Sequence, residues 1–349
     1  MRVLVTGANG FLGRHVVLAL AARGHDVRAL VRPSKAAPNT WPADRVEVVH
    51  ADLRRKRDLP SVVERIDAIV HLAACVVGDD ETQFVNTVVA TENLLGAALA
   101  ADVDRFVLCS SFSVYDWRKP LRILNERSQL ETKLYARDGY AVAKAWQERL
   151  VRRYAEQHDW RLTVMRPGFI WAPDVPMPAA VGHSVGRWHL VFGGLRTLPI
   201  TYVENCAECF AAALDRPDAM GETFNIVDTE RIRAWRFAGT YLRENRVAGA
   251  RVFIPYWCGL AAAAVASFVI RAWLGPTAKL PGLLVPIRYR ARFRPLRATS
   301  AKAQSLLGWR PKWNFRQAWR RYGRESIPAA AAHRSATTAT PLVPELAVD

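Results

Sequence analysis

The apolar and polar positions in the first half of the chain follow two alternating patterns. Short apolar runs typical of buried strands are separated by stretches in which apolar residues recur at helical spacing. We expect strands over 3–5, 27–31, 46–51, 68–72, 106–110 and 162–165, and helices near 59–65, 84–101 and 139–158. Strands that alternate with helices predict a parallel sheet with helices on both faces.

The pattern loosens after Arg166-Pro167-Gly168. Residues 169–200 are rich in Pro, Gly and Trp, which indicates loops with short elements. Further along we expect a helix over 205–214 and a strand over 223–227, then an apolar, arginine-rich stretch over 248–298. Residues 328–349 are rich in Ala, Thr and Pro without periodicity, a composition typical of disorder.

A glycine-rich turn joins the first strand to the first helical pattern. It runs from Thr6 to Gly13 with the sequence TGANGFLG. Gly7 permits a tight turn, Gly10 allows the backbone to approach a phosphate, and Gly13 lets the helix pack closely on the strand. The start of the helix adds free N–H groups and a partial positive charge. This arrangement indicates a site for the pyrophosphate of a dinucleotide.

These features define the expected architecture: an α/β protein with a Rossmann-type doubly wound parallel sheet and a smaller C-terminal substrate lobe. The dinucleotide-binding part comprises residues 1–168, and residues 205–227 return to it. The substrate lobe comprises 169–325, and 326–349 form a disordered tail.

The charge and the cysteine content of the chain limit its expected partners and cellular compartment. The 349-residue chain has a formal net charge of +17 and a pI of about 10.2. This excess of positive charge indicates either an anionic partner or a surface charge that keeps the protein soluble. Five cysteines show no disulfide framework, and no signal-peptide pattern precedes the first strand, so we expect a cytoplasmic protein. Cys206 and Cys209 are expected to be structural thiols, with no metal bound. No nucleic-acid-binding module is recognised.

Three side chains carry candidate chemistry. Tyr140 and Lys144 are spaced i and i+4, so within a helix they share a face. A nearby ammonium and a positively charged nicotinamide both favour phenolate, so we expect the pKa of Tyr140 to fall below its ordinary value and allow proton transfer near neutral pH. Ser110 and Ser111 follow the apolar run that ends at the edge where parallel sheets bind ligands. A serine there can hydrogen-bond a substrate oxygen, or only satisfy backbone groups.

At this point the chain resembles the extended short-chain dehydrogenase/reductase family, in particular its epimerase/dehydratase and 3β-hydroxysteroid dehydrogenase-like group, over residues 1–325. The matching segments are the glycine turn 6–13, Asp52-Leu53, His71-Leu72-Ala73-Ala74, Asn86, Ser111 with Tyr115, Tyr140 with Lys144, Arg166 to Pro173, and Leu307 to Pro311.

The resemblance implies roles for these residues. Tyr140 would move the hydroxyl proton, Ser111 would polarise the substrate oxygen, and Lys144 would hold the nicotinamide ribose and tune Tyr140. The cofactor-binding set would be Thr6, Gly7, Asn9, Gly10, Phe11, Leu12, Gly13, Arg32, Asp52, Leu53, Leu72, Ala73, Ala74, Asn86, Tyr140, Lys144 and Pro167. The resemblance also implies a homodimer that pairs through helices 84–101 and 139–158.

The end of the second strand bears on the choice of cofactor. Arg32 stands where a carboxylate would bind the adenosine ribose and repel a 2′-phosphate. Because an arginine can pair with that phosphate, NADP(H) is favoured, with help from Lys35. The alternative is a solvated Arg32 that permits NAD(H).

The most distinctive feature of the C-terminal lobe is an apolar run over 252–270 between Arg251 and Arg271. Its length reaches that of a membrane span. It can be a buried or substrate-capping helix, an interfacial anchor, or, least favoured, a spanning helix. The nearby segment 287–294 alternates arginines with apolar residues. This pattern suits an anionic lipid surface, a nucleotide-sugar diphosphate or an ordinary edge strand, so 251–294 is a candidate for peripheral membrane contact.

The combined prediction is an NAD(P)(H)-dependent oxidoreductase that interconverts a secondary alcohol and a ketone, on a small and apolar, lipid-like or sterol-like substrate. An NAD-dependent nucleotide-sugar epimerase is the alternative. A non-catalytic cofactor-binding scaffold is a third hypothesis, against which Tyr140 and Lys144 argue. A sugar dehydratase is disfavoured because Phe112 and Ser113 stand where that reaction needs carboxylates.

Overall fold

A seven-stranded parallel sheet forms the centre of the part of the chain that the computed structural model describes, which is residues 1–119, 123–134, 137–275, 278 and 280–325. Its strand order is β12-β7-β5-β4-β1-β2-β3. The strands are β1 (Arg2–Thr6), β2 (Asp26–Val31), β3 (Val46–His50), β4 (Ala68–His71), β5 (Arg105–Cys109), β7 (Arg161–Pro167) and β12 (Thr223–Ile226). The winding direction reverses between β1 and β4, which confirms the doubly wound fold expected from the sequence.

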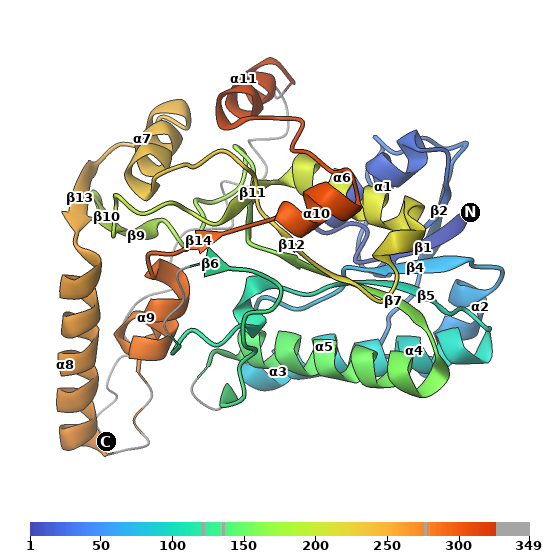
Figure 1. The fold of residues 1–349 in the computed structure, drawn as a ribbon, viewed down its shortest axis with the longest axis horizontal. Helices are drawn as coiled ribbons and strands as arrows, with labels where there is room; N and C mark the ends of the chain where they lie inside the picture. Colours follow the sequence, from blue (N-terminus) through green and yellow to red (C-terminus); the bar gives the residue numbers. More distant parts are fainter. Residues whose placement is uncertain (120–122, 135–136, 276–277, 279, 326–349) are drawn as a thin grey trace.

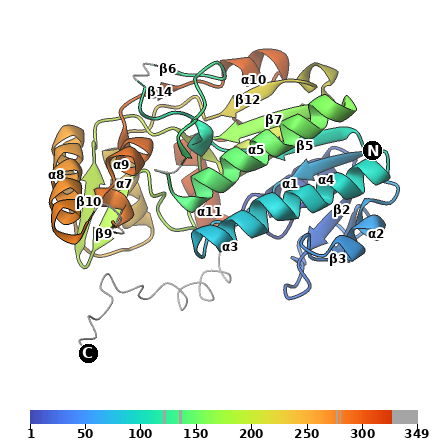
Figure 2. The same cartoon turned by 90° about the horizontal axis from the view of Figure 1, so that it is seen from below.

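Helices cover both faces of this sheet (Figure 1). On one face lie α1 (Gly13–Ala22) and α6 (Val203–Asp215), whose apolar residues share one core with the sheet. On the other face lie α2 (Leu59–Val63), α4 (Ala90–Ala100) and α5 (Gly139–His158), whose buried residues form a second core. Figure 2 shows α5 running beside α3 (Asp80–Phe84) and α4. The carboxyl ends of the strands are left to form the site.

The helix expected over 84–101 is interrupted. The structure has α3, then a π-helical turn over Val85–Val89, then α4. Within this turn Thr87 accepts a hydrogen bond from the backbone N–H of Cys75 at 3.0 Å, and Thr91 donates to the Thr87 carbonyl at 2.5 Å. The helix expected over 84–101 is therefore present, but it begins earlier, at Asp80, and includes a local i→i+5 turn next to these contacts with the loop after β4.

The C-terminal lobe is built from short strands and three helices. β10 (Trp188–Phe192) pairs antiparallel with β9 (Gly182–Val185) and parallel with β13 (Ala250–Ile254). Two smaller pairs, β8 (Phe169–Trp171) with β11 (Ile200–Tyr202) and β6 (Ile123–Leu124) with β14 (Arg297–Ala298), join the lobe to the sheet. The helices are α7 (Ala234–Glu244), α8 (Tyr256–Leu274) and α9 (Pro286–Phe293).

Two expectations for this lobe are corrected. The apolar run 252–270 is not one element: its first residues belong to β13, and α8 begins only after Pro255. The alternating segment 287–294 is not an edge strand but helix α9. Tyr289 and Phe293 explain this, since they lie four residues apart on one helical face and are both buried.

The final described segment returns to the sheet. After α10 (Ala301–Leu306), the side chain of Asn205 in α6 donates to the Trp313 carbonyl at 2.8 Å and accepts from its N–H at 2.9 Å. The Trp309 indole donates to the Asn205 carbonyl at 3.0 Å. These contacts place the motif Leu307–Pro311 against α6, and α11 (Phe315–Glu325) follows. The tail expected to be disordered, 326–349, lies outside the described residues.

Candidate active site

The glycine turn after β1 is a cradle that side chains would fill. Gly7 has φ of +68°, and a Cβ there would lie 2.8 Å from the backbone nitrogen of Ala73. A Cβ at Gly13 would lie within 2.1 Å of the Gly7 carbonyl oxygen. Both positions therefore need glycine for the reasons expected from the sequence. Helix α1 begins directly after this turn with no side-chain cap. The N–H groups of Arg14 and His15 bond to the carbonyls of Gly10 and Leu12 at 3.2 and 3.1 Å, so an anion would meet the N–H groups of the turn that precede Arg14.

A cavity of about 530 Å³ extends from this turn across the carboxyl ends of β4, β5 and β7. That volume suits a bound small molecule. Predicted site residues that line it are Gly7, Gly10, Phe11, Leu12, Gly13, Leu72, Ala74, Ser111, Tyr140, Lys144 and Pro167. Glycine turn, serine, tyrosine and lysine thus meet at one surface although they are up to 137 residues apart.

Tyr140 lies in the first turn of α5, whose start is capped by Asp138: its carboxylate accepts from the N–H of Ala141 at 3.0 Å. Burial raises the pKa of Tyr140 well above its ordinary value, and a hydrogen bond with Ser111 opposes this only in part. The expected fall in pKa was therefore wrong for the protein's own groups. The reason is that the desolvation of phenolate outweighs any help from the lysine one turn away.

Lys144 is held in place by two acceptors. Its ammonium donates to the Cys109 carbonyl at 2.7 Å and to the Gln147 side-chain oxygen at 2.9 Å. Among the described residues its third N–H has no partner, and the residue lines the cavity. Burial lowers the pKa of Lys144 from its ordinary value. This lysine is thus a fixed, desolvated cation with one donor left for a ligand.

Gln147 connects Lys144 to a buried network that the sequence did not suggest. Its amide nitrogen lies 2.8 Å from the Thr91 hydroxyl and 3.1 Å from Nε2 of His71. The other ring nitrogen of His71 lies 2.7 Å from the Thr6 hydroxyl, which links β4 to β1. Burial, aided by the charge of Lys144, lowers the pKa of His71 to about 3, so the ring is neutral. Thr6 is thereby a supporting residue beneath the cradle.

The two neighbouring serines have different environments. The Ser110 hydroxyl is buried and donates to Glu148 at 2.5 Å, within an ion pair between Glu148 and Arg166. Burial opposes the charge of Glu148, but Arg166 outweighs it and lowers the carboxyl pKa. Both serines line the cavity, but the Ser111 hydroxyl is not held by Glu148 and hydrogen-bonds Tyr140. Ser111 is therefore the serine that can meet a ligand.

Several predicted cofactor residues do not line the cavity. Arg32 follows β2 at the surface, and Asp52 follows β3 with its carboxylate held by Arg54 at 2.5 Å. This hydrogen bond lowers the pKa of Asp52 to about 2. Asn86 lies in the π-turn and donates to the Thr82 carbonyl at 2.8 Å. The side-chain amide of Asn9 donates to the Ala36 carbonyl. The carbonyls of Leu53 and Ala73 accept from the side-chain amides of Asn93 and Gln147 respectively.

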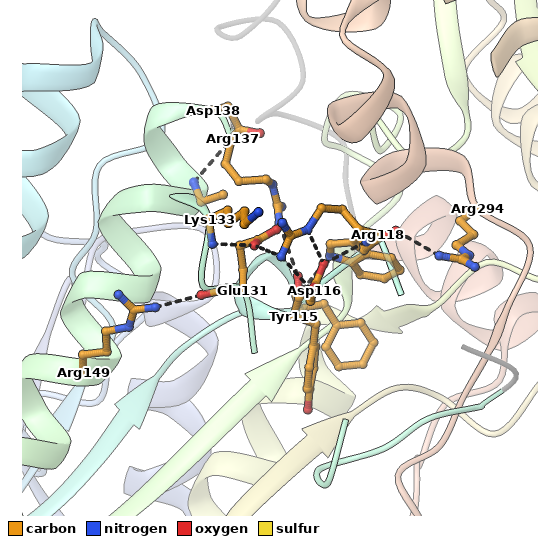
Figure 3. Close-up of polar contacts among 12 residues, drawn as sticks. Tyr115, Asp116, Arg118, Glu131, Lys133, Arg137, Asp138, Arg149 and Arg294 are labelled. Atoms are coloured by element: carbon orange, nitrogen blue, oxygen red, sulfur yellow. Dashed lines mark hydrogen bonds and ion pairs between the residues drawn. The ribbon is translucent and has the colours of Figure 1, made fainter. Parts of the chain in front are cut away.

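Sequence reasoning missed a cluster of charged residues formed by Asp116, Arg118, Glu131 and Arg137 (Figure 3). Arg118 pairs with Asp116 at 2.8 Å and with Glu131 at 3.0 Å. Arg137 lies 3.7 Å from Glu131, donates to the Tyr115 carbonyl at 3.2 Å and lines the cavity, while its Nε has no hydrogen-bond partner among the described residues. In the sequence, the only hint of this cluster is that Arg137 lies three residues before Tyr140.

The rest of the cavity wall is largely apolar. It includes Phe112, Trp117, Phe169, Ile170, Ala179 and Ala291. Arg292 of α9 joins them from the C-terminal lobe. Cys206 and Cys209 lie apart from this site as free, buried thiols of α6, and burial raises the pKa of each.

Known proteins share both the sequence pattern and the fold. A family model described as the NAD dependent epimerase/dehydratase family matches residues 3–227. A ketoreductase of Stigmatella aurantiaca, named for 4-hydroxy-2-methyl-3-oxo-4-farnesyl-3,4-dihydroquinoline-1-oxide, is 30% identical over 88% of this chain and 92% of that protein. A 3 beta-hydroxysteroid dehydrogenase/Delta 5-->4-isomerase of Mycobacterium tuberculosis is 34% identical over 68% of this chain and 67% of its own length.

Among solved structures, UDP-glucuronic acid 4-epimerase from Bacillus cereus in complex with NAD has a TM-score of 0.66 at 21% identity. The match covers 91% of this chain and 94% of that one. It shows the same fold. Taken with the glycine cradle and the matched residues 3–227, these similarities show that the chain belongs to the NAD-dependent epimerase/dehydratase family of extended short-chain dehydrogenases/reductases and is an NAD(P)-dependent oxidoreductase.

Proposed function

We propose that this protein reduces a ketone on an apolar substrate to a secondary alcohol with NADPH, and catalyses the reverse reaction less readily. The observation that carries the proposal is the convergence of Ser111, Tyr140 and Lys144 on one largely apolar cavity beside the glycine cradle. The substrate class draws support from the names of the relatives, a farnesylated-quinoline ketoreductase and a hydroxysteroid dehydrogenase.

Each polar residue has a separate task in this scheme. Ser111 donates a hydrogen bond to the substrate oxygen, and Tyr140 gives that oxygen its proton. Lys144, fixed by Cys109 and Gln147, uses its remaining N–H for the ribose of the cofactor. The nicotinamide supplies the hydride when it is bound. The glycine turn and the start of α1 take the pyrophosphate, and Leu72, Ala74 and Pro167 line its path.

The Tyr140 environment determines which form of the phenol is present at neutral pH. Because burial raises the pKa of this phenol, it keeps its proton at neutral pH. A protonated phenol is the form that donates to a carbonyl oxygen, whereas alcohol oxidation needs phenolate. The protein's own residues therefore favour reduction.

NADPH is the preferred cofactor in this proposal because of Arg32. The β1–β2 register pairs Thr6 with Leu30, so Arg32 comes two residues further toward the same sheet edge as the glycine turn. Among the described residues its guanidinium has no hydrogen-bond or ion-pair partner. The nearby Asp52 carboxylate is neutralised by Arg54, which removes a source of repulsion for a 2′-phosphate.

Calorimetric titration with NADP⁺ and NAD⁺ tests the cofactor choice. We expect tighter binding of NADP⁺, and a loss of about tenfold or more for NADP⁺ alone in Arg32→Ala. Arg45→Ala, a surface arginine at the opposite end of the neighbouring strand, should leave both affinities unchanged. Preference for NAD⁺ in the unaltered protein would refute the NADP assignment.

A nucleotide-sugar epimerase is the second candidate function. Arg137 and Arg292 in the cavity wall favour it, since arginines bind diphosphates. This alternative predicts tightly retained NAD and no net consumption of reduced cofactor. A non-catalytic scaffold would retain its biological effect when Tyr140 and Lys144 are replaced.

The remaining assignments concern setting and assembly. We propose that 169–325, apart from the returning segment 205–227, forms the substrate lobe, and that the protein works in the cytoplasm at the inner membrane face. We also propose a homodimer through α4 and α5, where Trp146 is a large apolar residue left exposed. Light scattering should then give twice the 39.1 kDa mass of the chain, and a mass of one chain would refute the dimer.

A further inference from the structure

Helix α8 exposes an unusual amount of apolar surface. It is long and apolar enough to cross a membrane by length and composition, with a mean hydropathy of 1.6, yet only 22% of that window is buried. Trp257 is 72% exposed, Phe268 75% and Trp273 87%. In both views the helix stands at the far end of the molecule from β3 (Figures 1 and 2). An apolar face of this size marks a surface that meets another apolar phase.

The opposite side of α8 is firmly packed. Tyr256, Leu260 and Ala263 are buried in a cluster with Tyr289 and Phe293 of α9. The Tyr289 hydroxyl also donates to the Tyr256 carbonyl at 3.3 Å. Helical spacing of about 100° per residue places Val265 opposite this cluster and Trp257 and Phe268 at its flank. The helix therefore has a docked face and an apolar outer face.

The charges around α8 all have one sign. Residues 245–300, which include α8 and α9, contain nine lysines and arginines and no aspartate or glutamate, so this stretch carries about half of the net charge of +17. Arg271 is exposed on the last turn of α8, and Arg290 lies partly exposed on α9. A cationic, acid-free region around exposed tryptophan and phenylalanine is complementary to an anionic lipid surface.

We propose that the outer face of α8 docks on the surface of an anionic bilayer, and that the apolar substrate reaches the cavity from that surface. The proposal rests on the apolar-substrate function given above. α9 connects the two sites, because Tyr289 and Phe293 support α8 while Ala291 and Arg292 line the cavity. A bilayer on the outer face of α8 is thus separated from the cavity by α8 and α9.

The same observations argue against other ways of covering this face. A second copy would bring two strongly cationic regions together, and like charges repel. A helix that crossed the bilayer would have to withdraw Tyr256, Leu260 and Ala263 from their cluster with α9. Docking in the plane of the surface keeps that cluster intact.

Vesicle sedimentation of the full chain tests the docking. The vesicles are phosphatidylcholine alone or phosphatidylcholine with about one third phosphatidylglycerol. We expect at least about tenfold stronger binding to the anionic vesicles, weakened by salt. Phe268→Ser should lower this binding about tenfold, whereas Leu195→Ser, which removes a similarly exposed leucine outside α8, should not.

Other results would overturn the proposal. Equal binding to both kinds of vesicle, or binding to neither, would do so. So would a dimer seen by light scattering that Phe268→Ser dissociates, because a second copy would then cover α8. Each variant is also assayed with a water-soluble ketone and NADPH. Normal turnover without vesicle binding refutes docking alone, and absent turnover with intact vesicle binding counts against the proposed function alone.

Discussion

At the residue scale, Tyr140 and Lys144 have opposite pKa shifts from one cause. Burial raises the pKa of the phenol and lowers that of the ammonium, because it penalises the charged form of each. The tyrosine therefore favours its neutral, proton-donating form. The i, i+4 spacing could be identified from the sequence, but the degree of burial that sets the direction of the Tyr140 shift could not.

This shift predicts how the two reaction directions depend on pH. Reduction requires the phenol, so its kcat/KM should stay level through neutral pH and fall only at alkaline pH. Oxidation requires phenolate, so its kcat/KM should rise toward the raised pKa of Tyr140. Rate profiles measured in both directions check this. An oxidation rate already at its plateau at pH 7 would contradict it.

Gln147 should prove to be a positioning residue for Lys144. Replacing it in Gln147→Leu removes the acceptor 2.9 Å from the ammonium, so we expect kcat to fall about tenfold or more and the pH profile to shift. Gln157→Leu, an exposed glutamine on the same helix, is the matched control. Unchanged kcat and pH profile in a folded Gln147→Leu protein would show that Lys144 needs no such support.

The site residues that could not be predicted from the sequence were missed for one common reason. Gln147 and Arg137 belong to no recurrent spacing, and their importance comes from contacts with residues distant along the chain, His71 and Glu131. Glycine turns, by contrast, show their constraint locally. Gly7 could therefore be assigned from sequence, whereas the partners of Lys144 could not.

At the element scale, the parallel sheet was predictable because its strands are apolar runs and most of them are followed by a helix. The C-terminal lobe was not. The alternation in 287–294 imitates a strand, yet Tyr289 and Phe293 bury one helical face against α8. The apolar run 252–270 contains a boundary between two elements at Pro255. Strand β13, which pairs with β10, ends before it, and helix α8 begins after it. Tertiary pairing decides both cases.

The α8–α9 contact depends on a glycine. A Cβ at Gly259 would lie 2.0 Å from the Tyr289 hydroxyl, whose ring is fully buried between Phe192 and Phe293. Gly259→Ala should therefore destabilise the protein by about 1–3 kcal/mol and raise KM through movement of α9. Gly96→Ala in α4, where a Cβ has open space, should be neutral or stabilising. Thermal melts and ketone kinetics compare them, and an unshifted melt for Gly259→Ala would refute this contact.

Asp228 links β11 and α6 through bonds to Thr201, Tyr202 and Asn205. Burial raises its pKa to about 7 despite these bonds. Between pH of about 4 and 7 the unfolded chain loses this proton while the folded chain keeps it, so stability from this group falls as pH rises.

The substitution Asp228→Asn removes that dependence. The variant should gain melting temperature relative to the unaltered protein as pH rises from 5 to about 7. Asp218→Asn, at an exposed site, should show no such trend. A constant difference for Asp228→Asn across this range would exclude a raised pKa.

At the scale of the whole molecule, chemistry and charge are separated. The sheet and its glycine cradle lie toward one end, and exposed α8, with α9 and its arginines, lies at the other. The cavity lies where these two parts meet, since residues of α9 line it together with the strand ends. This arrangement suits an enzyme that takes its cofactor from water and its substrate from an apolar phase.

The most direct test of ketone reduction at this site follows the hydride. NADPH carrying deuterium at the transferable position is incubated with cyclic and long-chain ketones, and the products are analysed by mass spectrometry. We expect a secondary alcohol that carries one deuterium from the cofactor. The Tyr140→Phe variant should still bind NADP⁺ but should form this alcohol at least about a hundredfold more slowly. Interconversion of nucleotide sugars with no net use of reduced cofactor, and no labelled alcohol from any ketone, would contradict the account.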